Sequence, residues 1–286
     1  MPIVVFLALA FGFSWAIALG LQQAGGFAGA GPTLAVWLIA YMFGPAVGAV
    51  GASLIFDRSR FLDALSLTPI RWRAVIVWTV LAWAIGIVLV AAALGASLIG
   101  LGEGPADASA RLMAQVEAAG VTDLPMSAEA FLLVTLFVNV PIGIVINTVL
   151  ITLNEELGWR GWLQPRLSEL GFWPASIVVG VIWGLWHAPI VLMGHNYPGM
   201  GWTGVALMVG FTTLLSPYHA LVRERSGHVV PAGALHGTVN GVAALGILFS
   251  PVMTWPWNGL LGYGGFAAMA AGWVAIWLYR ARRIAA

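Results

Sequence analysis

The chain alternates between long apolar stretches and short polar ones. Five stretches contain no charged residue: 1–56, 74–102, 130–154, 170–222 and 226–279. A helix needs about 20 apolar residues to cross the hydrocarbon core of a bilayer. The two shorter stretches therefore predict one helix each, and the three longer ones predict two helices joined by a hairpin. The pattern predicts an all-α, polytopic membrane bundle of about eight transmembrane helices.

Turn residues interrupt the longer stretches where hairpins are needed. We expect spans at roughly 3–21, 33–56, 74–100, 130–154, 174–194, 203–222, 230–249 and 258–279. The polar segment 103–129 predicts an outer loop that carries a surface helix over 108–119. Pro141 is expected to kink or break the fourth span, because proline cannot donate the helical hydrogen bond.

Composition supports a membrane protein and excludes several other classes. Hydrophobic residues make up 60% of the chain and charged residues only 8%, about a third of the charge typical of a soluble domain. The absence of cysteine excludes disulfides and thiolate sites. A net charge of +1 without a basic patch gives no basis for nucleic-acid binding.

Arginine placement predicts the orientation. The arginines concentrate in four places: 57–73, 160–169, 223–225 and the tail 280–283. Under the positive-inside rule these segments are cytoplasmic, and their alternation with eight spans puts both termini inside. The N-terminal apolar run lacks a basic leader and a cleavage pattern, so we expect a retained helix.

The stretch 153–167 places charge between apolar segments, where ionisable residues are expensive and mark functional sites by default. Glu156 and Arg160 are four residues apart on one helix face, in the favourable order for an ion pair. Glu155 is rotated by about 100° from Glu156. One carboxylate can therefore be neutralised while the other stays free. A structural salt bridge near the headgroups is the simpler interpretation of these charges.

Further polar residues lie inside later apolar spans. Trp183 precedes His187 by one turn, and His236 and Asn240 share one helix face. With helices ending near 168 and beginning near 174, Glu155 and His187 each lie 13 residues, or about 20 Å, from the inner surface. We therefore expect one buried, inward-opening cavity. Taken singly, such residues are more often interhelical hydrogen-bonding groups.

Three motifs stand in order in the second half of the chain: Glu155-Glu156-x-x-x-Arg160, Trp183-x-x-x-His187 and His236-x-x-x-Asn240. Together they resemble the motifs of the CAAX-protease and bacteriocin-processing (CPBP, or Abi) family. The resemblance covers roughly 130–249. Trp183 departs from the family pattern, which usually has phenylalanine at this position.

The resemblance implies an intramembrane endopeptidase. Two residues would activate a water molecule for attack on a peptide carbonyl: Glu155 and His187. Two would stabilise the oxyanion: His236 and Asn240. Three would position these groups: Glu156, Arg160 and Trp183. Such chemistry needs a base and donors directed at the developing negative charge.

A metal centre is the competing interpretation. Glu155, His187 and His236 would form a His₂Glu set with one position left for water, a pattern found in catalytic zinc sites. Spacing alone does not distinguish this Zn²⁺ site from a metal-free one. No other cofactor is expected.

Two other function classes remain open at the sequence level. The polar groups would also suit a small transporter or proton-coupled carrier, although no internal repeat is visible. A non-catalytic immunity or partner protein is the third class. Arginine without lysine, with abundant alanine and glycine, indicates a bacterial inner-membrane protein. The orientation predicted from the arginines makes the inward-opening cavity face the cytoplasm. Its partners would be the lipid bilayer and a membrane-anchored, lipidated or apolar peptide; the natural substrate stays open.

The chain is predicted to form a single transmembrane domain over 1–286. Scaffold helices and the outer loop occupy 1–127, the CPBP-like core occupies 128–249, and a final helix with a basic tail occupies 250–286.

Overall fold

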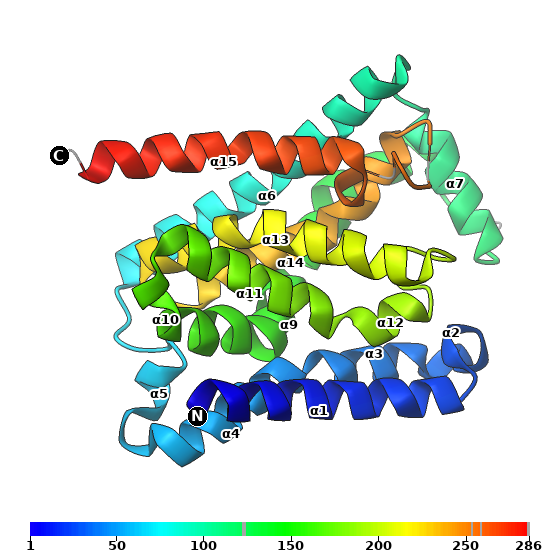
Figure 1. Cartoon of the computed structure of the whole chain (residues 1–286). Helices are drawn as coiled ribbons and strands as arrows, with labels where there is room; N and C mark the ends of the chain where they lie inside the picture. The colour runs from blue at the N-terminus through cyan, green and yellow to red at the C-terminus, as the bar shows by residue number, and fades with distance from the viewer. Residues whose placement is uncertain (122–123, 253, 258, 285–286) are drawn as a thin grey trace.

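The computed structural model describes residues 1–121, 124–252, 254–257 and 259–284. Within these ranges the chain forms helices and no β-strand (Figure 1), which confirms the expected all-α membrane bundle. Parts of the predicted outer loop, last turn and tail lie outside the described residues: 122–123, 253, 258 and 285–286.

The first half of the chain forms helices of very different lengths. Their bounds are α1 (Pro2–Gln23), α2 (Gly26–Gly29), η1 (Gly31–Thr33), α3 (Leu34–Met42), α4 (Gly44–Phe56), η2 (Arg58–Arg60), α5 (Phe61–Ala64), α6 (Trp72–Leu101) and α7 (Ala108–Ala118).

The second half begins with one long, irregular helical stretch and ends with α15. The bounds are α8 (Ala128–Val134), η3 (Thr135–Asn139), α9 (Val140–Ile151), η4 (Thr152–Leu163), α10 (Gln164–Arg166), η5 (Ser168–Leu170), α11 (Phe172–Trp186), α12 (Ala188–Leu192), α13 (Gly201–Ser226), α14 (Val230–Phe249), η6 (Gly259–Leu261) and α15 (Tyr263–Ile284).

Six stretches of the described chain are long and apolar enough to cross a membrane. They are Pro2–Gln23, Gly31–Phe56, Trp72–Leu101, Ala128–Arg166, Gly201–Ser226 and Val230–Phe249. The other two expected spans correspond to α11 with α12 and to α15. The apolar helix α11 has only 15 residues because the chain breaks at His187. The count of eight and the orientation of the termini stay predictions.

The expected break near Pro141 takes the form of a wide turn. The segment η3 is π-helical and ends at Asn139, and α9 then begins with Pro141 in its first turn. The helix runs on without a free end there, and a π-helical turn beside a proline is one way in which a helix adjusts to the hydrogen bond that proline cannot donate.

The surface helix expected over 108–119 is α7, which begins after Asp107. The Asp107 carboxylate accepts hydrogen bonds from the backbone N–H of Ala110 and from Ser109, and these bonds lower the pKa of Asp107. An aspartate at this position satisfies N–H groups that the first turn leaves unpaired.

The core packs around η4. This segment contacts α4, α9 and α14, while α11 packs along α13. Figure 1 shows α1 and α3 on one side of this central group and α15 on the other. The helices of the first half therefore cover the segment that carries the two glutamates.

Candidate active site

The acidic pair lies in a π-helix rather than in the continuous α-helix that the sequence predicted. The segment η4 covers Thr152–Leu163, and both Glu155 and Glu156 are buried in it, at 3% and 0% exposure. π-Helical turns are rare and occur frequently at functional sites. The widened helix therefore coincides with the charges that marked this stretch in the sequence.

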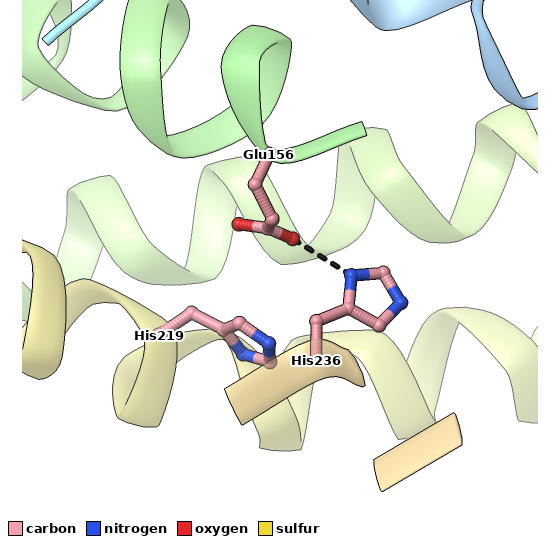
Figure 2. Close-up of side chains that lie close together, drawn as sticks. All are labelled: Glu156, His219 and His236. Atoms are coloured by element: carbon pink, nitrogen blue, oxygen red, sulfur yellow. Dashed lines mark hydrogen bonds and ion pairs between the residues drawn. The ribbon is translucent and has the colours of Figure 1, made fainter. Parts of the chain in front are cut away.

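Glu156 is held by two side chains, the guanidinium of Arg160 and the imidazole of His236. Its Oε1 accepts a hydrogen bond from Nη1 of Arg160 at 2.8 Å and another from Nδ1 of His236, also at 2.8 Å (Figure 2). The ion pair with Arg160 is the one expected from the four-residue spacing, and both side chains are fully buried. Glu156 thus connects η4 to α14.

Glu155 has a different environment. Its Oε2 accepts a hydrogen bond from the indole Nε1 of Trp183 at 2.9 Å. Its Oε1 accepts no hydrogen bond from a residue that the structure describes. The two adjacent carboxylates are therefore distinguished as expected: one is tied into an ion pair and the other keeps an oxygen for a further ligand.

Trp183 lies at the centre of the site. Besides donating to Glu155, its ring contacts the rings of His187 and His236 at centroid distances of 6.0 and 4.9 Å. The guanidinium of Arg160 lies over the same ring, 4.5 Å from its centroid, in cation–π geometry. Trp183 therefore contacts every ionisable group of the motifs except Glu156.

His187 occupies the break between α11 and α12, and its ring is fixed by the preceding turn. Its Nδ1 lies 2.8 Å from the carbonyl oxygen of Trp183. A carbonyl can only accept, so Nδ1 carries the proton and donates. In the neutral ring this leaves the lone pair on Nε2, which is the form needed to accept a proton from water.

His236 reaches Glu156 because α14 approaches α9 and η4 closely. A Cβ added at Gly233 would lie 1.8 Å from Oγ1 of Thr152, and one added at Gly237 would lie 2.5 Å from the backbone N of Thr148. Only glycine allows these contacts. The pair brackets His236, so the missing side chains set its distance from Glu156.

Asn240 differs from His236 in burial, and its expected part in stabilising the oxyanion stays a prediction. Its side chain is exposed, whereas His236 is buried. Four residues advance a helix by one turn and by about 40° around its axis. That rotation carries Asn240 past the edge of the packed face of α14.

His219 is a site residue that the sequence interpretation missed. The sequence interpretation gave it no role, whereas in the structure His219 is fully buried. Its ring lies 5.6 Å from the rings of both Trp183 and His236. The helix α13 continues to Ser226, two turns beyond His219, and this extension places it at depth. Its place inside the charge-free stretch 170–222 was the available signal.

One group in the described part of the chain has the geometry to hold a metal ion: Glu156, His219 and His236, with ligand atoms within 4.8 Å of one another. It shares only His236 with the set expected from the sequence. Two of its buried atoms, Oε2 of Glu156 and Nε2 of His219, have no hydrogen-bond partner. Against a cation stands Arg160, whose positive charge already lies 2.8 Å from Glu156.

The arrangement can perform acid–base chemistry in a water-poor setting. A carboxylate oxygen of Glu155 and Nε2 of His187 are both available as proton acceptors, and Trp183 holds both residues. Ion pairing, indole contacts and glycine packing restrict how the groups can move. Such fixed dipoles and bases are what hydrolytic sites require.

Comparisons with known proteins converge on this part of the chain. A family described as "Type II CAAX prenyl endopeptidase Rce1-like" matches residues 137–242. A stretch of 44 residues is 43% identical to the protein named "CAAX prenyl protease 2" from Methanococcus maripaludis and covers 15% of this chain. The match spans 16% of the length of that curated relative. No solved structure matches the chain.

Proposed function

Through residues 137–242 this chain belongs to the family of CAAX-type intramembrane proteases, and from that membership we propose that it is an intramembrane endopeptidase. One observation supports the proposal most directly. The matched segment contains Glu155, His187 and His236, and the fold brings all three around Trp183 from three separate helices.

In the proposed reaction a water molecule donates one hydrogen bond to Glu155 and one to Nε2 of His187. The oxygen attacks the peptide carbonyl while Glu155 takes the proton, and such general-base catalysis contributes about 10²–10⁴-fold in rate. The C–N bond then breaks as Glu155 returns this proton to the leaving amine nitrogen. Nδ1 of His236 donates to the Glu156 carboxylate, so His236 would donate from Nε2 to the oxyanion as an imidazolium, in which both ring nitrogens carry a proton. Asn240, exposed one turn along α14, would contact only a substrate that approaches from that face.

The substrate class follows from the setting. A site buried among apolar helices suits a peptide that is itself apolar or membrane-anchored. The names of the family and of the archaeal relative refer to prenylated CAAX sequences. We therefore propose a membrane-anchored peptide as the substrate, with a prenylated C-terminal cysteine as the first chemistry to test.

The test is cleavage of quenched fluorescent peptides by detergent-purified protein, with prenylated and unprenylated versions of each sequence. We expect turnover by the parent protein and none by His187→Ala, because the variant lacks the ring nitrogen that orients water. Peptide cleavage in micelles, where no second compartment exists, also separates an enzyme from a carrier. Equal turnover by the parent and by His187→Ala would contradict the proposed site.

We further propose that the reaction needs no metal ion. Glu156 is the only carboxylate of the metal-capable group, and its Oε1 is already shared by Arg160 and His236. A divalent cation at this position would face the guanidinium at short range, which costs free energy in a low-dielectric interior.

Chelation is therefore expected to leave turnover unchanged. The measurement is peptide cleavage after incubation with 1,10-phenanthroline, with its non-chelating 1,7 isomer as the matched control. Turnover that the chelator abolishes and added zinc restores would identify a metalloenzyme instead.

A further inference from the structure

His187 lies at a helix break, and the peptide unit before it is held from outside the family segment. The helix α11 ends at Trp186 and α12 begins at Ala188. In an uninterrupted helix, the carbonyl of Trp186 would accept from the backbone N–H four residues later. Here the same carbonyl accepts hydrogen bonds from two side chains: the hydroxyl of Tyr41 and the indole Nε1 of Trp15.

Both donors belong to the first half of the chain, outside the matched residues 137–242. Tyr41 lies on α3 and is 1% exposed, and its ring packs on the ring of Trp186 at a centroid distance of 4.6 Å. The Tyr41 backbone carbonyl accepts from Oγ of Ser14 on α1 at 2.7 Å. Trp15, also on α1, donates to the Trp186 carbonyl at 3.1 Å.

These contacts bear directly on the imidazole. The Trp186 carbonyl and the His187 N–H belong to one planar peptide unit. Fixing the carbonyl therefore fixes the direction in which the Cα of His187 leaves the helix. The backbone N–H of His187 donates to the carbonyl of Gly184 at 3.1 Å, and Nδ1 of the His187 ring donates to the backbone carbonyl of Trp183. The contacts of the peptide unit and of the ring together determine the direction in which Nε2 of His187 points.

We propose that Tyr41, with Trp15 as a second donor, is a positioning residue for the reaction. Through the Trp186 carbonyl it sets the orientation of His187, so the N-terminal helices contribute to catalysis as well as covering the core. The inference rests on the proposed endopeptidase function.

The test compares Tyr41→Phe with Tyr197→Phe. Tyr197 is also 1% exposed, and its hydroxyl also donates to a backbone carbonyl, that of Leu261 at 2.9 Å. Both variants lose one buried hydrogen bond and no ring packing. We expect Tyr41→Phe to lower kcat by about 10-fold, since small displacements of a catalytic group cost 10- to 100-fold. KM should stay unchanged, because His187 acts on water and not on the bound peptide.

A second comparison tests the same carbonyl through its other donor, and Trp15→Phe alone, which keeps Tyr41, is also expected to lower kcat. Trp15→Phe removes the other donor to the same carbonyl, and the double variant removes both. Because the remaining donor still restrains the carbonyl in part in each single variant, we expect the double variant to lose more in kcat than the product of the two single losses. A double variant whose loss in kcat equals the product of the two single losses would overturn the proposal.

The outcomes separate this inference from the function on which it rests. Absence of turnover by the parent on every peptide would count against the endopeptidase itself. Turnover by the parent, with Tyr41→Phe and Tyr197→Phe equal in kcat, would overturn the positioning role alone. A loss that appears in KM rather than in kcat would also overturn it.

Discussion

Replacing Glu155 by glutamine is expected to lower kcat by about 10²–10⁴-fold, the contribution of a general base. Glutamine keeps the size of the side chain, and its carbonyl oxygen can still accept the hydrogen bond from Trp183 Nε1 that the carboxylate accepts at 2.9 Å. The amide cannot take a proton from water. The fold should therefore survive while the chemistry is lost.

The measurement is peptide turnover beside thermal unfolding in the same detergent. Glu224→Gln is the matched control, since Glu224 forms an exposed ion pair with Arg280 at the end of α13. It should keep full turnover. If Glu155→Gln kept turnover while a folded Glu156→Gln protein lost it, the general base would be Glu156 and not Glu155.

Replacing Arg160 by methionine is expected to give the largest loss of stability among single changes at the site. Methionine fills the space but leaves the Glu156 carboxylate, fully buried, without its ion-pair partner. Breaking a buried pair from one side typically costs about 3–5 kcal/mol. The variant also loses the guanidinium contact with Trp183 and the hydrogen bond to Oγ of Ser216 at 3.3 Å.

Thermal unfolding of the purified protein measures this loss. Arg280→Met breaks an ion pair that is partly exposed, and such pairs contribute at most about 1 kcal/mol. The double variant Glu156→Gln with Arg160→Met should recover part of the stability, because no unpaired charge remains. An Arg160→Met protein as stable as Arg280→Met would show that Glu156 is neutral or otherwise compensated in the folded state.

The sequence alone determined the membrane bundle and the family. Apolar stretches of about 20 residues or more fix the class of fold, because only helices and closed barrels satisfy the backbone in a bilayer and stretches of this length suit helices. The three motifs resemble those of the CAAX-protease family, and the family match over residues 137–242 supports that resemblance. The ion pair of Glu156 with Arg160 was also predictable, because residues four apart on a helix are neighbours whatever surrounds them.

Contacts between helices could not be obtained in this way. His219, to which the sequence gave no role, is buried beside the site, and Asn240, which its spacing groups with His236, is exposed. Spacing within one helix gives relative angles only. Which face is buried depends on how far each helix extends and how it is rotated against its neighbours, and the close approach at Gly233 and Gly237 decides this for α14.

The π-helix η4 and the contacts of Trp15 and Tyr41 with the Trp186 carbonyl likewise required the tertiary structure. A π-helix differs from an α-helix in its i→i+5 hydrogen bonds, and a segment as short as η4 carries no sequence pattern that separates the two. The two side-chain donors lie 171 and 145 residues from Trp186 in the chain, and only packing of α1 and α3 against the helix break brings them to it. The sequence by itself therefore determined the fold class, the family and the neighbours within each helix, and the packing of helices decided which of those residues meet.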